Sequence, residues 1–346
     1  MLIDSLLKEA VEEGASDVHL VANLPAFWRV DGILEPIGKK IFSSDEIKDI
    51  TEEMLDKNQL NRFLTNRDMD LAYELNGGQR FRVNFHWEKG NIGIAARIIP
   101  TTIPTLEEVR MPEVIYKMIE ADRGLILVTG PTGCGKSTSL AAMINHINEN
   151  RSANIITLED PIEFVFQPIK SIIRQRQLGT DMLTFESGLV HALRQDPNVI
   201  MVGEMRDLET IATTITLAET GHLVFATLHT YSAAQTIDRI IDIFPPHQQN
   251  QIRMQLSLVL RGVISQRLLP KINGGRIAAR EILINTPAIA NLIRENKVAQ
   301  IKSIIQTSGR EKMITMDAAI KDLFKAGLIS KETYELNITQ LSKIEF

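Results

Sequence analysis

The sequence of 346 residues contains a single cysteine, Cys134, and this scarcity excludes two kinds of structure. One thiol can form neither an internal disulfide nor a zinc site of four cysteines, so the chain suits a reducing compartment. Long apolar runs are also missing, because no stretch approaches the roughly 18 residues of a membrane-spanning helix. Residues 1–9 have neither a basic start nor a long apolar stretch. We therefore expect no signal peptide and no membrane span.

Basic residues are not in excess, and aromatic residues are few. The chain has 38 Lys and Arg against 43 Asp and Glu, a net charge of −5, with 5% aromatic residues. This balance does not favour a protein that coats nucleic acid or anionic lipid, and we expect no nucleic-acid partner. With 44% hydrophobic and 23% charged residues, the composition is that of an ordinary globular chain, and the length suggests about two domains.

A glycine-rich stretch that follows an apolar run is the strongest signal in the chain. The pattern G-x-x-x-x-G-K-[ST] is matched by Gly130, Pro131, Thr132, Gly133, Cys134, Gly135, Lys136, Ser137 and Thr138. Glycines let a backbone wrap around a phosphate, and the helix that follows adds its positive end. Lys136 should reach the β- and γ-phosphates, and the hydroxyl of Ser137 should bind Mg²⁺. The stretch predicts a site for ATP and Mg²⁺.

Cys134 occupies a variable position of this phosphate loop, where any small side chain would serve. We interpret the thiol as a filler without a chemical role. Its position nevertheless predicts that alkylation inhibits the protein and that bound ATP protects the thiol.

The first hundred residues predict a small α/β domain with a mixed sheet. An amphipathic helix should end near Gly14, and residues 45–64 have helical periodicity. Turns are expected at 30–33, 76–78 and 89–91. Asp17 and His19 are two residues apart and should share one face of a strand, which we interpret as a polar sheet face rather than a metal or catalytic pair.

Three arginines should lie on the surface of this first domain. Residues 79–85 alternate between polar and aromatic or apolar residues, so Arg80 and Arg82 should project from one face of a strand. Arg97 follows on the next strand. The aromatic residues of the alternation should face the core.

Proline marks the boundary between the two domains. The stretch 100–105 is too rich in proline for a helix or a central strand. We expect a domain over 1–100, a linker over 101–110 and a second domain over 111–346. In the second domain, short apolar strands alternate with helices, which predicts a parallel α/β sheet. Residues 250–269 are expected to form one helix, and residues from Thr315 onward a small helical bundle.

Polar residues follow the predicted parallel strands at the point where each strand ends. Strands are expected at 154–158, 198–202 and 223–227, and the side chains that follow them are those of Glu159, Asp160, Glu163, Glu204 and His229. Because ligands bind outside the carboxyl ends of strands in such sheets, these side chains should share a crevice with Lys136.

The chemistry of phosphoryl transfer suggests roles for these residues. Attack by water on a γ-phosphate needs a carboxylate that orients the water and accepts its proton, and Glu204 is the candidate. The alternative is that Glu204 belongs to the cap region of a helix beginning near Asp207, where acidic residues are favoured anyway. Glu159, Asp160 and Glu163 could hold Mg²⁺ through water or orient the ribose and the attacking water.

Two histidines flank the last of these strands, His222 before it and His229 after it. A lone histidine is usually structural. A histidine beside phosphate chemistry can also sense the γ-phosphate through a hydrogen bond.

These motifs together resemble the secretion ATPase superfamily of the PilT/GspE type and, within it, the motors that retract type IV pili. The resemblance covers essentially the whole chain. The stretches that carry it are residues 15–20, the loop at 130–138, an acidic box at 156–164, an atypical Walker B at 199–207 and a histidine box at 220–230. Residues 285–295 resemble a motif associated with retraction, except that Ala290 stands where the family usually has arginine.

The resemblance implies a homohexameric ring whose subunits have a PAS-like N-terminal domain and a RecA-like ATPase domain with C-terminal helices. It implies that Glu204 is the catalytic base and that Arg82 and Arg97 act in a neighbouring subunit as arginine fingers. It further implies a peripheral protein at the cytoplasmic face of the bacterial inner membrane, which acts on a platform protein of the PilC kind, with or without a second retraction ATPase.

Other functions remain open at this point. One is a related motor for pilus assembly or type IV secretion, although extension ATPases of this superfamily usually carry a Cys₄ zinc site that one cysteine cannot form. A second is a switch that binds ATP without turnover, against which Glu204 and the acidic cluster argue. A DNA helicase is the third, and no basic stripe with interleaved aromatic residues supports it.

Overall fold

The computed structural model describes residues 2–30, 33–76, 78–100 and 102–344. The chain divides into two compact units, Met1–Thr102 and Ile103–Phe346. Each has its own hydrophobic core. No helix among the described residues is long and apolar enough to cross a membrane.

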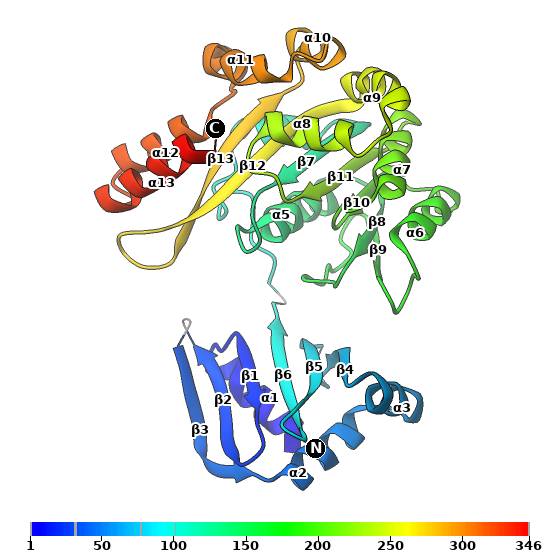
Figure 1. The fold of residues 1–346 in the computed structure, drawn as a ribbon, viewed down its shortest axis with the longest axis vertical. Helices are drawn as coiled ribbons and strands as arrows, with labels where there is room; N and C mark the ends of the chain where they lie inside the picture. The colour runs from blue at the N-terminus through cyan, green and yellow to red at the C-terminus, as the bar shows by residue number, and fades with distance from the viewer. Residues whose placement is uncertain (1, 31–32, 77, 101, 345–346) are drawn as a thin grey trace. The chain divides into compact units, whose positions relative to one another are not determined.

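The described residues of the N-terminal unit form one antiparallel sheet with three helices (Figure 1). The strands lie in the order β3-β2-β1-β6-β5-β4, and every pairing is antiparallel, so the sheet is not mixed as expected. Their bounds are β1 Asp17–Leu20, β2 Leu24–Val30, β3 Ile33–Phe42, β4 Asp68–Glu74, β5 Arg80–Glu88 and β6 Asn91–Ile99. Part of the expected turn at 30–33, and residue 77 of the turn at 76–78, lie outside the described residues.

The helices of this unit are α1 (Leu2–Glu12), α2 (Ser44–Met54) and α3 (Lys57–Asn66). The segment 45–64, whose sequence has helical periodicity throughout, therefore forms two helices. The break lies at Asp56, whose carboxylate accepts hydrogen bonds from the backbone N–H groups of Asn58 and Gln59 and so begins a new helix.

Strand β5 alternates as its sequence predicts. Phe81, Val83 and Phe85 are fully buried in the core beneath the helices. Arg82 points to the other face and stands opposite Arg97 of β6. All three predicted arginines of this open face have carboxylate partners, namely Glu74 for Arg80, Asp70 for Arg82 and Asp17 for Arg97.

The C-terminal unit is built on a second sheet, whose strands lie in the order β13-β12-β7-β11-β10-β8-β9. All pairings are parallel except that of β12 with β13. The bounds are β7 Gly124–Thr129, β8 Asn154–Glu159, β9 Ile172–Gln177, β10 Val199–Val202, β11 Leu223–Leu228, β12 Leu260–Pro270 and β13 Arg276–Ile284.

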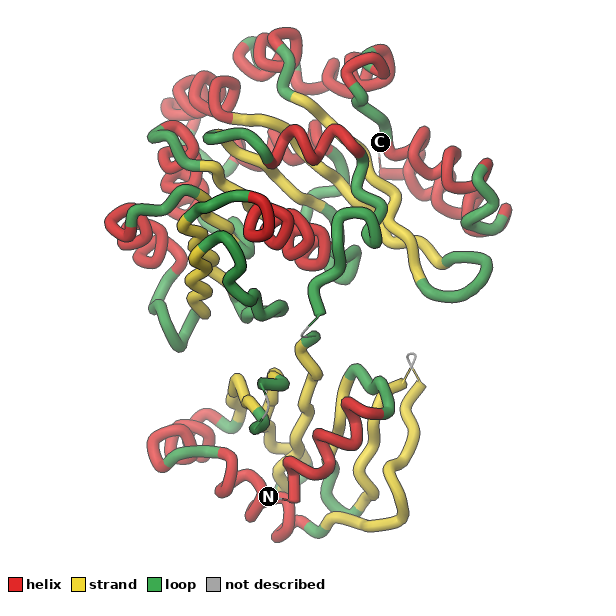
Figure 2. Tube along the Cα trace, turned by 180° about the vertical axis from the view of Figure 1, so that it is seen from behind, coloured by secondary structure: helices red, strands yellow, loops and turns green. Residues whose placement is uncertain are grey.

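Helices cover both faces of this sheet (Figures 1 and 2). The core on one face includes residues of α4 (Glu113–Ile119) and α5 (Lys136–Asn150). The core on the other face includes α6 (Phe185–Ala192), α7 (Leu208–Glu219), α8 (Ala233–Asp242), α9 (Pro246–Val259), α10 (Pro287–Arg294) and α11 (Ile301–Thr307). The expected bundle at the end of the chain is a pair of helices, α12 (Met316–Lys325) and α13 (Lys331–Ile344), which lie against Leu269 and Ile277.

The helix expected over 250–269 was wrong in its second half. Helix α9 ends at Val259, and the next residues form β12 between β7 and β13. Gly262 permits β13 to lie close to β12, because a Cβ atom there would lie 2.5 Å from the carbonyl oxygen of Leu283 on β13. Val263 and Ile264, which follow, are β-branched and fully buried, as a central strand requires.

The segment 103–110, which belongs to the predicted linker, is part of the C-terminal unit. Leu106 is 1% exposed and lies in the same core cluster as Met111 and α4. The apolar core of this unit therefore begins soon after the proline-rich stretch.

Candidate functional site

The phosphate loop connects β7 to α5 at the centre of the sheet. Gly130 has a φ of +143°, and a Cβ atom there would lie 2.3 Å from the carbonyl oxygen of Gln266. Gly135 caps α5 with a φ of 86° and without a side-chain hydrogen bond to the first turn. The N-terminal turn of α5 therefore presents backbone N–H groups that suit an anion.

Lys136 reaches back into the loop. Its ammonium group donates hydrogen bonds to the carbonyl oxygens of Gly130 at 2.8 Å and Pro131 at 3.2 Å. Burial lowers the pKa of Lys136, and the charges of Glu204 and Glu163 oppose that change. Both carboxylates thus act on the ammonium group, as expected if they face the same crevice.

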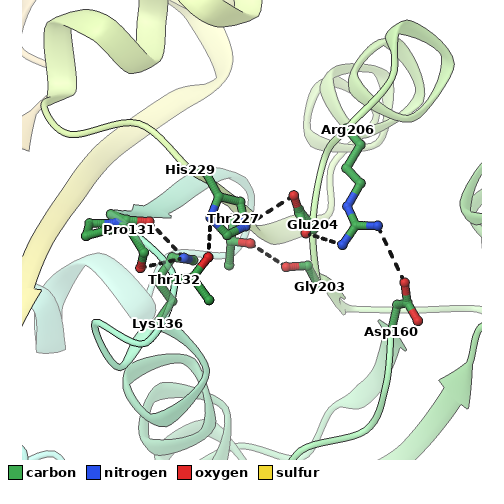
Figure 3. Close-up of polar contacts among 10 residues, drawn as sticks. Pro131, Thr132, Lys136, Asp160, Gly203, Glu204, Arg206, Thr227 and His229 are labelled. Carbon is green, nitrogen blue, oxygen red and sulfur yellow. Dashed lines mark hydrogen bonds and ion pairs between the residues drawn. The ribbon is translucent and has the colours of Figure 1, made fainter. Parts of the chain in front are cut away.

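The carboxyl ends of four neighbouring parallel strands meet at this loop. Strand β7 pairs with β11, β11 with β10 and β10 with β8. A chain of contacts crosses these strand ends (Figure 3). Oγ1 of Thr132 lies 3.4 Å from Nδ1 of His229, whose Nε2 lies 3.2 Å from Oε1 of Glu204.

Arg206 continues this chain of contacts beyond Glu204. Its Nη2 atom lies 2.8 Å from Oε2 of Glu204, and its Nη1 atom lies 3.7 Å from Oδ2 of Asp160. Arg206 belongs to the sequence box at 199–207. Its ion pairs with Glu204 and Asp160 could not be predicted from the sequence, because they depend on the three-dimensional arrangement of the strand ends.

Glu204 is held as a carboxylate. Burial alone would raise its pKa, but the hydrogen bond from Arg206 and the charges of His229 and Arg206 outweigh burial, so the pKa of Glu204 is lowered. Glu204 does not cap helix α7, which was the alternative role for it. The cap is Asp207, whose carboxylate accepts a hydrogen bond from the N–H group of Thr210. The neighbouring Gly203 is bonded through its carbonyl oxygen to the hydroxyl of Thr227.

The acidic box at the end of β8 separates into three environments. Glu159 is 6% exposed, and its Oε1 atom accepts hydrogen bonds from Oγ1 of Thr157 at 2.6 Å and Nε2 of Gln175 at 3.1 Å. Burial raises the pKa of Glu159. Asp160 is partly exposed beside Arg206, and Glu163 is exposed within electrostatic range of Lys136.

Of the three residues predicted to bind Mg²⁺, Ser137 and Asp160 suit that ion and Glu159 does not. Among the described residues, no cluster of three or more His, Cys, Asp or Glu side chains could hold a metal alone. Ser137 lies in the first turn of α5 and Asp160 is accessible at a strand end, so hydroxyl and carboxylate oxygens, which Mg²⁺ prefers, are present. Glu159 does not fit direct ligation, because its carboxylate is occupied in the interior.

The structure does not bring His222 to this site. His222 precedes β11, at the edge of the sheet where Leu223 pairs with Gly124, whereas the loop follows the other end of β7. Its Nδ1 atom lies 3.0 Å from the carbonyl oxygen of Leu217 and 3.2 Å from Oγ1 of Thr220. His222 therefore lies at the opposite end of the strands from the phosphate loop, and its predicted contact with nucleotide stays a prediction.

Buried polar residues that the sequence did not reveal support the loop from β12 and β13. Nε2 of Gln266 donates to the carbonyl oxygen of Cys134 at 2.8 Å, and its Oε1 accepts from Oγ of Ser139 at 2.9 Å. Arg280 donates to the same Ser139 at 3.2 Å and to the carbonyl oxygen of Arg110 at 3.2 Å. Burial lowers the pKa of Arg280 to about 10, so it remains a cation at neutral pH.

Cys134 is buried rather than accessible. It is 3% exposed, and burial raises the pKa of its thiol. A Cβ atom on Gly130 would lie 2.7 Å from its sulfur. The expected alkylation of Cys134 is therefore disfavoured in the folded protein, because the reagent has little access to the sulfur and little of the thiol is ionised.

A family model described as "Type II/IV secretion system protein" matches residues 105–274. A relative from Pseudomonas aeruginosa, "Type IV pilus retractation ATPase PilT", is 48% identical over 332 residues, which are 96% of each chain. A "Twitching motility protein" from Neisseria gonorrhoeae is 47% identical over 330 residues, which are 95% of this chain and 88% of the relative.

A solved structure extends the similarity to the fold. "Crystal Structure of the Pilus Retraction Motor PilT and Bound ADP" aligns with a TM-score of 0.90 and 46% identity, over 96% of this chain and 95% of that one.

Proposed function

The chain belongs to the family of type II/IV secretion ATPases, in the branch of the PilT pilus retraction ATPases, and we propose that it works as a homohexameric motor that hydrolyses MgATP to retract type IV pili. The same proposal puts the motor at the cytoplasmic face of the bacterial inner membrane, on a platform protein of the PilC kind, with or without a second retraction ATPase. Residues 1–100 would form the PAS-like domain and 111–346 the RecA-like domain, and of the linker proposed over 101–110 the segment 103–110 packs with the second domain.

One observation carries the assignment of hydrolysis. The carboxylate of Glu204 is held between Arg206 and His229, and His229 contacts Thr132 of the phosphate loop. Glu204 is thereby kept ionised beside the loop, which is the state that a proton acceptor needs. A switch that only binds ATP would have no use for this arrangement.

Each loop and strand-end residue then has a role. Lys136 leaves the loop carbonyl oxygens and binds the β- and γ-phosphates, while the backbone N–H groups of the loop at 130–138, from which Pro131 is excluded because it has none, surround the phosphate chain. Ser137 and Asp160 would hold Mg²⁺, which when bound would supply positive charge against the phosphates. Glu163 orients water at the rim, and Glu159 holds the end of β8 from within rather than binding the ion.

His229 connects the base to the nucleotide. With a proton on Nε2 it donates to Glu204, and its Nδ1 atom accepts from the hydroxyl of Thr132. A γ-phosphate at the loop would compete for Thr132 and His229. The histidine is then placed to report the presence of that phosphate to Glu204.

Arg82 and Arg97 would add positive charge to that of Lys136 and Arg206 at the site. They stand side by side on the open face of the N-terminal sheet, and the side chain of Arg97 is 70% exposed. We assign them to the active site of the next subunit in the ring, where a guanidinium stabilises the charge on the transferring phosphoryl group.

The experiment that tests the function is deletion of the gene in its native host, followed by complementation. The deletion should give cells with excess surface pili that do not retract and with no twitching. The wild-type chain should restore retraction, Glu204→Gln should not, and Glu209→Gln, an exposed carboxylate of α7, should restore it fully. Cells that lack pili after the deletion would instead point to pilus assembly and overturn the proposal.

A further inference from the structure

Four buried hydroxyl groups form a chain of contacts in the C-terminal unit. They belong to Thr129 at the end of β7, Ser265 on β12, Thr236 on α8 and Thr230 between β11 and α8. None of the four residues is more than 6% exposed. Oγ1 of Thr129 lies 2.8 Å from Oγ of Ser265 and 3.5 Å from Oγ1 of Thr236. Oγ1 of Thr236 in turn lies 2.7 Å from Oγ1 of Thr230.

The two ends of this hydroxyl chain adjoin the two halves of the candidate site. Thr129 directly precedes the phosphate loop, and Thr230 directly follows His229. We call residues 229–232 the histidine loop. The two loops already touch where Thr132 contacts His229. The hydroxyl chain is a second connection between them, which runs through the interior.

Counting protons gives the direction of the central contact. Thr236 has one hydroxyl proton, which it donates to the carbonyl oxygen of Ser232 at 2.7 Å, because a carbonyl oxygen can only accept. Thr230 is therefore the donor to Thr236. Helix α8, which carries this acceptor, is bonded to the sheet, since Glu281 of β13 accepts a hydrogen bond from the N–H group of Ala233 at 2.8 Å. Thr230 thus ties the histidine loop to a helix that is itself fixed to β13.

The surroundings of the hydroxyl chain are apolar. The neighbouring residues Leu228, Ala233 and Ile237 belong to the hydrophobic core on this face of the sheet. A buried hydroxyl group costs free energy unless it is bonded, and a bonded network in such an interior favours one arrangement of its members. The hydroxyl chain therefore restrains the position of the histidine loop relative to the end of β7.

We propose that Thr236 is a positioning residue for ATP hydrolysis, which holds the histidine loop through Thr230 and so keeps His229 in place. The contacts of His229 with Glu204 and with the phosphate loop depend on that position. The inference rests on the proposed hydrolysis of ATP at this site. It adds a residue that acts on the site only through the histidine loop.

Thr236→Val is the central test, because valine has nearly the shape of threonine and lacks the hydroxyl group. Thr230 then loses its acceptor, and the histidine loop is no longer held. In steady-state hydrolysis of ATP by the full chain, kcat should fall about tenfold, the rate equivalent of one net hydrogen bond, while KM stays within about twofold. Thr236→Ser keeps the hydroxyl group and should keep most of the wild-type kcat.

The pH profile of kcat separates positioning from a loss of folded protein. Glu204 faces His229 and Arg206, with Lys136 at longer range and Asp160 beyond Arg206. Burial would raise the pKa of Glu204, and displacement of His229 removes one of the contacts that outweigh burial. The acidic limb should therefore move to higher pH in the valine variant and stay in place in the serine variant. A smaller folded fraction would instead lower the rate without moving the limb.

Thr214→Val is the matched control. Thr214 of α7 is as fully buried as Thr236, and its hydroxyl group likewise donates to the carbonyl oxygen four residues earlier, that of Thr210, at 2.7 Å. Among the described residues its hydroxyl group bonds to neither loop. This control should keep the kcat, the KM and the pH profile of the wild type. Thermal unfolding compares the stability of the two valine variants.

Thr230→Val removes the donor of the same contact and decides the matter if Thr236→Val does not fold. It should reproduce both the loss of kcat and the shifted limb. Where both variants fold, the double variant should be no slower than the slower single variant, because both changes remove one contact.

Three results would overturn the inference while ATP hydrolysis itself stands. One is an unchanged kcat in Thr236→Val or, if that variant does not fold, in Thr230→Val. Another is a lower kcat with an unmoved acidic limb, or a loss that the serine variant shares. The last is a double variant whose losses multiply. A wild-type chain that binds ATP without hydrolysing it would overturn the proposed function, and the inference with it.

Discussion

Nε2 of His229 lies 3.2 Å from Oε1 of Glu204, and this contact joins the histidine box to the proposed catalytic base. The two residues follow neighbouring strands, β11 and β10, whose parallel pairing brings their ends together. Arg206 holds the other oxygen of the same carboxylate. The orientation and charge of Glu204 are therefore set by two residues, His229 and Arg206, one on each carboxylate oxygen.

Glu204→Gln should lower kcat by about 10² to 10⁴ and leave ATP binding intact, because an amide keeps the shape of the side chain but cannot accept a proton. Steady-state hydrolysis and equilibrium binding of ATP measure the two effects. Glu209→Gln, which changes an exposed carboxylate in the first turn of α7, is the control and should retain wild-type turnover. A near-normal rate in Glu204→Gln would remove Glu204 from the role of base.

Arg206→Gln should shift the acidic limb of the pH profile of kcat to higher pH. Interactions with Arg206 and His229 hold the pKa of Glu204 below its usual value, so the wild-type carboxylate stays ionised as the pH falls through the ordinary range of a glutamate. Loss of the guanidinium raises that pKa, and protonation then begins at higher pH. Arg194→Gln, at an exposed position before β10, should leave the profile unchanged. An unshifted limb in Arg206→Gln would contradict the assignment.

Gln266→Ala should destabilise the C-terminal unit by about 1–3 kcal/mol and raise the KM for ATP. The substitution leaves the buried carbonyl oxygen of Cys134 and the hydroxyl of Ser139 without the partner that now bonds both. Urea unfolding and steady-state kinetics measure the two quantities. Gln251→Ala on the exposed side of α9 is the control. If only stability changed while KM stayed constant, Gln266 would not position the loop.

Cys134 should resist alkylation in the folded protein, with or without ATP. The thiol is 3% exposed and its pKa is raised by burial, so both access and the thiolate fraction are small. Labelling with a maleimide, followed by mass spectrometry, should be slow in native conditions and complete in guanidinium chloride. Rapid labelling that ATP prevents would show instead that the loop opens in solution.

Arg82→Ala and Lys136→Ala should each be inactive alone and should recover ATPase activity when mixed. In mixed rings some sites would combine an intact loop with an intact arginine from the neighbour, whose contribution is about 10³ to 10⁵ in rate. Arg62→Ala, on α3 of the same unit, is the control and should be active without mixing. Absence of recovery in hexamers with demonstrated subunit exchange would contradict action in trans.

Several features of the site could be predicted because they depend on local pattern. The spacing of glycines with Lys136 and Ser137, and the apolar runs that end at Glu159 and Glu204, are properties of short segments. The rule that parallel strands meet at their carboxyl ends then places their polar residues together. The alternation of β5 likewise predicted which side chains are buried, since successive residues of a strand face opposite sides.

What the sequence could not determine is which distant segment packs against which. β12 has the apolar character of either a buried helix or a buried strand, and only its insertion between β7 and β13 makes it a strand. That insertion brings Gln266 to Cys134, 132 residues earlier in the chain, and Arg267 to a pocket that residues 131–134 of the loop also line.

The sequence by itself determined the phosphate loop, the candidate catalytic carboxylate and the parallel sheet, because backbone conformation and periodicity depend on neighbouring residues. Only the tertiary structure decided that His229 rather than His222 reaches Glu204, that Glu159 is buried, and that Gln266 supports the loop. Those outcomes depend on contacts between residues far apart in sequence, which form only when the whole sheet assembles.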